Sequence, residues 1–136
     1  MTSRERIISA LNHKQPDKVP VDFGGTSVTG ISASIVYKLR KAFKLPEHPV
    51  KVIEPYQMLG EIEEDLREKI CADCALVLPY TGLFGFRLDG WKPWTLFDGT
   101  PVLVPGGFNT TLAPDGGLYQ YPEGDMTVLP SGYMPK

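Results

Sequence analysis

A glycine-rich loop is the clearest candidate for ligand contact in this chain: Gly24-Gly25-Thr26-Ser27-Val28-Thr29-Gly30. Its backbone N–H groups and hydroxyl side chains could together donate hydrogen bonds to an anionic group. The spacing is neither that of the dinucleotide-binding fingerprint nor that of a nucleotide-binding lysine loop. A tight turn between a strand and a helix capped by Ser32 explains the same residues, and the pattern favours it. The candidate substrate-binding residues of the loop are Gly24, Gly25, Thr26 and Ser27.

Two charged residues near glycines are further substrate-binding candidates. Asp22 precedes the loop within an apolar stretch, where its carboxylate could face a substrate or cap the turn. Arg87 follows Phe84-Gly85-Phe86 and could bind an anion or pair with a carboxylate such as Asp89. The pattern favours the structural interpretation of each, the cap for Asp22 and the ion pair for Arg87.

Metal and redox chemistry have little support in the residues. Cys71 and Cys74 form a single Cys-x-x-Cys, which could be redox-active or half of a zinc site. The second such pair is missing, and a buried small apolar residue is the favoured interpretation of Cys74. His13 and His48 have no neighbours at ligand spacing. No metal ligand and no catalytic residue is therefore assigned within the chain.

The elements expected before the glycine-rich loop are a helix, a turn and a strand. Thr2 and Glu5 have the spacing of a capping box ahead of an apolar helical stripe that ends at Leu11. Pro16 ends this helix, and residues 19–23 are then expected to form a buried strand. A helix, a first strand and a glycine loop in this order are how an α/β barrel can begin.

The middle of the chain predicts further helices and strands. Helices are expected over residues 32–43 and 56–70, from apolar residues recurring every three or four positions with charges between them. The basic side chains of the first of these helices are expected to face solvent. Residues 50–53 could form a short strand, and the apolar run 74–79 predicts a strand covered on both faces. Chemistry is then expected in the loops after the strands, at residues 24–30 and 79–87.

The last third of the chain predicts antiparallel hairpins. Asp98-Gly99 and Asp115-Gly116 each lie between short runs of apolar and β-branched residues. The expected organisation is therefore helix and first βα units at 1–90, an inserted β-meander at 91–121, and an extended tail at 122–136.

Charge and hydropathy exclude two classes of partner. The net charge is −2 with both signs interspersed, which argues against nucleic acid and anionic lipid. No apolar run approaches the roughly 20 residues of a membrane-spanning helix. We therefore expect a cytoplasmic protein that binds a small molecule.

An ordered series of short motifs resembles the opening of the uroporphyrinogen decarboxylase superfamily, and within it the branch of corrinoid-dependent methyltransferases. The motifs run from the first helix to the end of the chain: Arg4-Glu5-Arg6, Ala10-Leu11-Asn12-His13, residues 16–22, Gly24-Gly25-Thr26, Ala72-Asp73-Cys74, residues 84–87, residues 122–125 and residues 130–136. The resemblance covers essentially the whole chain, but only the front part of the family.

The resemblance implies a fold. We expect an α/β chain that forms the N-terminal portion of a TIM (β/α)8 barrel with the β-meander inserted. A complete barrel needs roughly 250 residues, and this chain has 136. The expected barrel is therefore incomplete, inactive as this piece, and prone to self-association through unpaired strand edges and uncovered apolar faces.

The resemblance also implies site chemistry. The decarboxylases place arginines in the loop after the first strand and an aspartate after the next barrel strand. Here residues 24–30 hold no arginine, and Tyr80 stands roughly where the aspartate would be, so Tyr80 is a further substrate-binding candidate. The methyltransferases bind zinc through late His and Cys residues, activate a thiol on it, and exchange a methyl group with a corrinoid carried by a partner protein. Zinc and corrinoid are expected only for a full-length parent.

Three functions stay open at this point. The leading hypothesis is methyl transfer to or from a zinc-activated thiol. The alternatives are porphyrinogen decarboxylation, as in haem biosynthesis, and a non-catalytic binding or assembly module built on the β-meander.

Overall fold

The computed structural model describes residues 1–136 and shows a mixed α/β fold with three short helices and two sheets. The helices are α1 (Ser3–Leu11), α2 (Ala33–Ala42) and α3 (Glu64–Lys69), with a 3₁₀ turn, η1, at Pro122–Gly124. The strands are β1 (Val50–Glu54), β2 (Leu59–Gly60), β3 (Lys92–Thr95), β4 (Pro101–Val104), β5 (Thr110–Leu112), β6 (Leu118–Gln120) and β7 (Gly132–Met134). None of the helices has the length and apolar character needed to cross a membrane.

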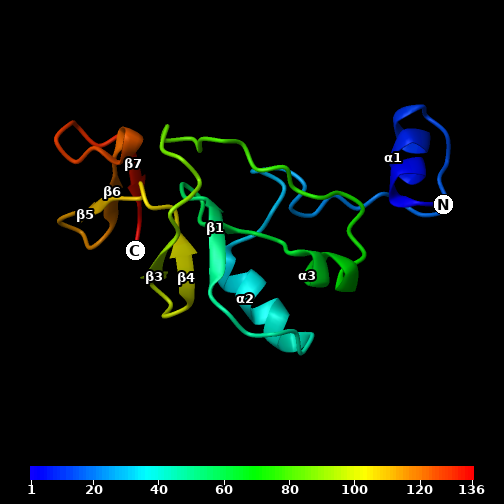
Figure 1. Cartoon of the computed structure of the whole chain (residues 1–136), viewed down its shortest axis with the longest axis horizontal. Coiled ribbons are helices and arrows are strands. Elements are labelled where there is room, and N and C mark those ends of the chain that lie inside the picture. The colour runs from blue at the N-terminus through cyan, green and yellow to red at the C-terminus, as the bar shows by residue number, and fades with distance from the viewer.

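The larger sheet has the strand order β2-β1-β4-β3 and carries the main core. β1 and β4 run parallel, with Val50 opposite Val102, whereas β2 and β3 lie antiparallel to their neighbours. α2 lies beside β1 (Figure 1). Val36 of α2, Val52 of β1 and Val102 of β4 are each at most 1 % exposed. The apolar sequence of β1 is therefore explained by burial between a helix and its neighbouring strands.

The smaller sheet has the order β5-β6-β7 and is antiparallel throughout. The predicted hairpins at Asp98-Gly99 and Asp115-Gly116 are both confirmed, as β3–β4 and β5–β6. They belong to different sheets, so residues 91–121 do not form one continuous meander. The tail is not a free extended segment either, because β7 pairs with β6 and Met134 is buried.

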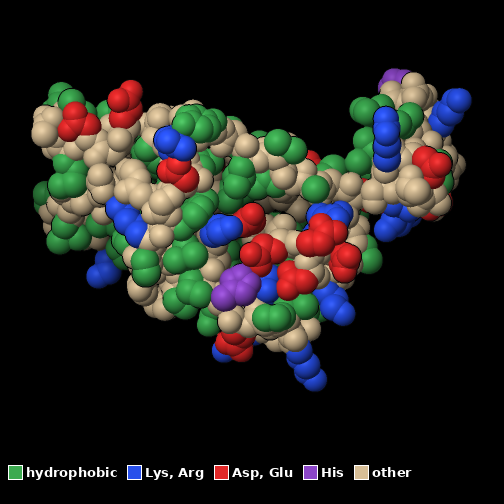
Figure 2. All heavy atoms as spheres, in the orientation of Figure 1, with side chains coloured by type: hydrophobic (Ala, Val, Ile, Leu, Met, Phe, Trp, Pro, Cys, Tyr) green, Lys and Arg blue, Asp and Glu red, His purple; other side chains and the backbone are tan.

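The first helix stands apart from both sheets at the N-terminal end of an elongated molecule (Figures 1 and 2). Its predicted capping box is confirmed: the Glu5 amide donates to the Thr2 hydroxyl, and the Thr2 amide donates to the Glu5 carboxylate. The helix over residues 32–43 is also confirmed as α2, with Ser32 as its N-cap.

One basic residue of α2 is buried, contrary to the expected solvent-facing role. The Arg40 guanidinium donates to both carboxylate oxygens of Asp65 at 2.8 Å and to Glu63 at 2.9 Å. It also donates to the Pro46 carbonyl oxygen. These bonds hold α2, the loop after it and the start of α3 together, and the bond from Arg40 lowers the pKa of Asp65.

The expectation of a partial (β/α)8 barrel is wrong. Helices and strands do not alternate: β1 is followed by the antiparallel β2, and the strands from β3 onward follow one another without an α-helix between them. In a barrel each strand shares a ladder with its neighbours. Here the segments 19–23 and 74–79, expected to be barrel strands, are not strands. The two segments meet near Val21 and Asp73. The Asp73 amide donates to the Val21 carbonyl oxygen at 2.7 Å, and the Val21 amide donates to the Asp73 carboxylate at 3.0 Å.

Two other predicted elements also differ from the structure. Residues 74–79 make no backbone hydrogen bond, and Val77 is 87 % exposed, because an apolar run favours a strand without providing its partner. The helix over 56–70 is present only as α3. Leu59 and Gly60 pair with β1 instead, and a Cβ on Gly60 would lie 2.8 Å from the Val50 side chain. Close strand packing at Gly60 thus overrides the helical periodicity.

Candidate functional site

A cavity of about 320 Å³ lies at the carboxyl end of β1. Its walls come from the glycine-rich loop, the turn after β1 and the loop that follows residues 74–79. Both loops that were expected to hold chemistry therefore line the same cavity. The polar lining residues are Ser27, Glu54, Gln57 and Thr81, and the apolar ones include Val28 and Leu83. The volume is large enough for a small organic molecule.

Glu54 is the only charged residue in the cavity lining, and it is 6 % exposed. One carboxylate oxygen accepts from the Tyr56 amide at 3.0 Å and the other from the Gln57 amide at 2.7 Å. These bonds shape the turn after β1. Because each carboxylate oxygen has two lone pairs, both can accept a further hydrogen bond.

The carboxylate of Asp22 caps the glycine-rich loop. Its Oδ1 accepts from the Gly25 amide at 3.0 Å and from the Thr29 hydroxyl at 3.2 Å. The Thr29 hydroxyl also accepts a hydrogen bond from the Thr26 amide, and the backbone carbonyl oxygen of Thr29 accepts one from the Gly24 amide. These bonds direct Asp22 and Thr26 into the turn itself, so Ser27 is the one candidate of this loop that lines the cavity.

The two adjacent glycines allow close packing. Gly24 has a φ of +84°, and a Cβ there would lie 2.5 Å from Cγ1 of Ile62. A Cβ on Gly25 would lie 2.5 Å from the Cβ of Cys74. Glycine is therefore required at both positions by backbone conformation or packing.

Tyr80 and Arg87 lie together outside the cavity lining. The guanidinium of Arg87 sits 4.6 Å from the centre of the Tyr80 ring, and its Nε is 2.7 Å from Oδ2 of Asp89. Tyr80 is 70 % exposed, so this pair is a surface arrangement. The structure places Arg87 in the ion pair that the sequence favoured.

The residues of this chain do not form a zinc site. Nowhere do three or more His, Cys, Asp or Glu side chains gather in a way that could hold a metal ion. Cys71 is exposed, and Cys74 lies beside Asp22 along a second hollow. Burial, reinforced by the nearby carboxylate, raises the pKa of the Cys74 thiol. Nε2 of His48 lies 3.0 Å from a carboxylate oxygen of Glu63. His48 is also distant from both cysteines along the sequence.

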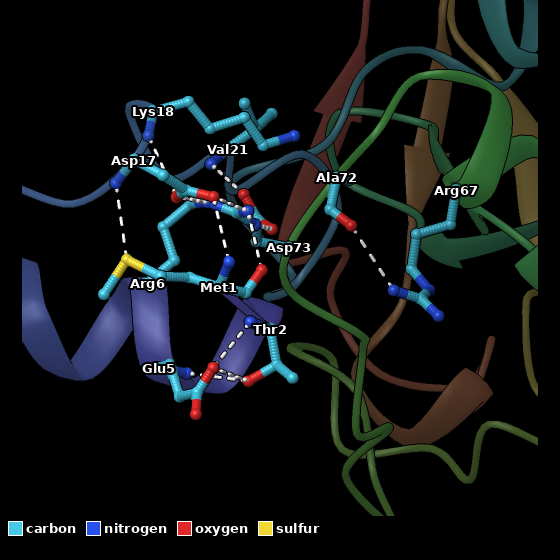
Figure 3. A network of polar contacts seen from close by, with 10 residues as sticks. All are labelled: Met1, Thr2, Glu5, Arg6, Asp17, Lys18, Val21, Arg67, Ala72 and Asp73. Atoms are coloured by element: carbon cyan, nitrogen blue, oxygen red, sulfur yellow. Dashed lines mark hydrogen bonds and ion pairs between the residues drawn. The ribbon is translucent and has the colours of Figure 1, made fainter.

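An ion network ties α1 to the start of the segment 74–79 (Figure 3). The Arg6 guanidinium forms a two-point ion pair with Asp17, at 2.7 and 2.9 Å, and a third bond with Asp73. The Arg6 pair lowers the pKa of Asp17, whereas the pKa of Asp73 is lowered chiefly by the Val21 amide. The network thus positions the segment that leads to Thr81 and the cavity.

Sequence reasoning missed three of the four polar lining residues. Thr81 lies in the loop 79–87, where chemistry is expected, but no pattern distinguishes it from its neighbours. Gln57 falls within the helix predicted over residues 56–70, whereas Glu54 lies between that helix and the strand predicted over residues 50–53. An acid at the end of an apolar strand, followed directly by Pro55, was the available signal for Glu54.

The chain matches no protein-family model, no curated protein and no solved structure.

Proposed function

We propose that the cavity at the end of β1 binds the substrate of a methyltransferase-type enzyme of the uroporphyrinogen decarboxylase superfamily. In this proposal the enzyme moves a methyl group between a small thiol and a corrinoid carried by a partner protein in the cytoplasm. The observation that carries the proposal is that both predicted loops, 24–30 and 79–87, contribute to the same cavity. The order of motifs along the sequence supplies the reaction class.

The cavity chemistry supports methyl transfer over porphyrinogen decarboxylation. A porphyrinogen is a large polyacid that calls for guanidinium or ammonium partners. No Lys or Arg lines this cavity, and the one charged lining residue, Glu54, would repel a carboxylate. Arg87 is already paired with Asp89. A compact ligand without negative charge fits these walls better.

The proposal assigns substrate binding to this chain and leaves metal activation outside its residues. Zinc, when bound in such enzymes, lowers the pKa of a thiol by coordinating it. In this proposal the residues of the chain bind and orient the substrate. Ser27 and Thr81 supply hydroxyl groups that can orient a small polar substrate.

The test compares two ligand classes on the full chain by NMR titration. We expect 2-mercaptoethanol to shift the amide resonances of Ser27, Gln57 and Thr81 in a saturable way. A reduced tetrapyrrole polycarboxylate should leave them unchanged. Saturable binding of the polycarboxylate without binding of the thiol would reverse the preference and favour decarboxylation. Leu112, exposed on β5 and outside the cavity lining, serves as an internal reference.

A further inference from the structure

The buried charges of this chain are paired, with one exception. Arg6 and Asp73 pair with each other, and Arg40 pairs with Glu63 and Asp65. Glu54 is 6 % exposed, yet no Lys, Arg or His lies within 4.0 Å of its carboxylate. Acidic side chains are almost never this buried unless they are paired. Glu54 therefore stands out among the charged residues.

The turn after β1 accounts for only part of the hydrogen-bonding capacity of Glu54. The Tyr56 and Gln57 amides occupy one acceptor position on each oxygen, and the remaining positions have no donor from the chain. The same side chain contributes to the wall of the 320 Å³ cavity. A ligand in that cavity can thus reach a desolvated carboxylate with free acceptor positions.

We infer that this cavity binds a small organic cation whose ammonium group pairs with Glu54. The lining offers no positive charge to compete with the ligand, and it offers the hydroxyls of Ser27 and Thr81 for the ligand's other polar atoms. Apolar contact comes from side chains such as Val28 and Leu83. This inference rests on the proposed use of the cavity as a binding site, but not on methyl transfer. If both hold, the thiol substrate carries an amine.

The experiment compares three small thiols of different charge by isothermal titration calorimetry and NMR on the full chain at pH 6.5. Cysteamine is cationic, 2-mercaptoethanol is neutral and mercaptoacetate is anionic, while all three thiols remain protonated. We expect cysteamine to bind about tenfold or more tightly than 2-mercaptoethanol, because a charge-assisted hydrogen bond contributes more than a neutral one. Mercaptoacetate should bind most weakly. Equal binding of all three would overturn the inference.

A fourth ligand separates this inference from the proposed function. Ethanolammonium has the charge of cysteamine without its thiol. Equal binding of ethanolammonium and cysteamine, with no binding of 2-mercaptoethanol, would support the cation site and contradict the thiol substrate. Binding of 2-mercaptoethanol as tight as that of cysteamine would keep the thiol site and overturn the cation site. Absence of binding by all four ligands would overturn both.

Two variants assign the effect to Glu54. Glu54→Gln should reduce cysteamine affinity to that of 2-mercaptoethanol and leave the neutral thiol unaffected. If the loss of a turn acceptor unfolds this variant, Leu83→Lys gives the same answer from the cavity rim. Leu83 is 72 % exposed, so a lysine there should fold, and its ammonium should compete for Glu54 and remove the preference for cations.

The matched control is Leu112→Lys on β5. Leu112 is 73 % exposed and outside the cavity lining, so this variant adds the same charge to the chain outside the cavity. It should bind cysteamine as tightly as the original chain. A loss of cation preference in Leu112→Lys equal to that in Leu83→Lys would show a general effect of net charge, and would overturn the assignment to the cavity.

Discussion

At the scale of single residues, the Arg6 network makes the stability of the chain depend on pH. The pKa values of Asp17 and Asp73 both lie below the ordinary value of 3.8, because their ionised forms accept hydrogen bonds from Arg6 and the Val21 amide. A carboxylate with a lowered folded-state pKa stabilises the fold above its unfolded pKa. That stabilisation is lost as the pH falls from about 5 through 3.8 towards the lower folded-state values.

We predict that Asp73→Asn removes part of this pH dependence, while the part that comes from Asp17 remains. Urea unfolding at pH 6 and pH 3 should show a large loss of stability on acidification for the original chain and a smaller loss for the variant. The matched control is Asp89→Asn, which breaks the exposed pair with Arg87 and should change the free energy of unfolding by at most about 1 kcal/mol. If Asp73→Asn and the original chain lost equal amounts of stability between pH 6 and pH 3, the result would contradict a role for Asp73 in the pH dependence.

The cap of the helix that carries Arg6 could be predicted from the sequence, but the network itself could not. The capping box is a local pattern, so the spacing of Thr2 and Glu5 is enough to predict it. The contact of Arg6 with Asp73 joins residues that are 67 positions apart, and no local pattern announces it. The same holds for Glu54, whose burial depends on loops from two distant parts of the chain.

At the scale of elements, the extended segment 74–79 is the feature with unused pairing capacity. Its backbone makes no hydrogen bond within the chain, and the exposed fractions are 87 % for Val77 and 37 % for Leu78. An apolar segment with free N–H and C=O groups is a template for pairing with another chain. Since residues 74–79 carry no charge, two copies can pair without repulsion.

We predict that Val77→Lys reduces self-association without lowering stability. The side chain is exposed, so lysine loses little packing, and its charge opposes close pairing of two copies. Light scattering coupled to size exclusion, over a range of concentrations, measures the change. Thr95→Lys on the edge strand β3 is a control for added charge, since Thr95 is also exposed. Equal association of the original chain and Val77→Lys would exclude this segment as the contact.

At the scale of the whole molecule, the chain exposes more surface than its size requires. Its accessible area is 7973 Å², against about 7,000 Å² for a folded chain of 15.0 kDa. The elongated outline in Figure 2, with α1 apart from the sheets, accounts for this excess. The difference is close to the roughly 800 Å² that each partner buries in a standard interface.

We predict that amide exchange divides the molecule into regions of different stability. Amides of β1 and β4 should exchange slowly, because these strands lie inside the larger sheet and include Val52 and Val104, both fully buried. Amides of residues 75–78 should exchange within seconds, because they have no hydrogen-bond acceptor in the chain. Hydrogen exchange with mass spectrometry measures both regions. Strong protection of 75–78 at a concentration where the chain is monomeric would contradict the unpaired arrangement.

The sequence by itself determined the features that depend on neighbours along the chain. These are the capped helix α1, the helix α2, the strand β1 and the two Asp-Gly hairpins. Each follows from a cap, a periodic apolar stripe or a turn whose causes lie within about ten residues.

Only the tertiary structure decided which strands pair and which loops meet. An apolar run indicates that a segment favours burial or pairing, but the partner is chosen by packing across the whole chain. Residues 74–79 therefore have the pattern of a buried barrel strand and are unpaired, whereas Leu59 and Gly60 have a helical pattern and pair with β1. The same long-range packing brought Glu54 between two loops, which is why no local pattern could identify the most informative residue of the cavity.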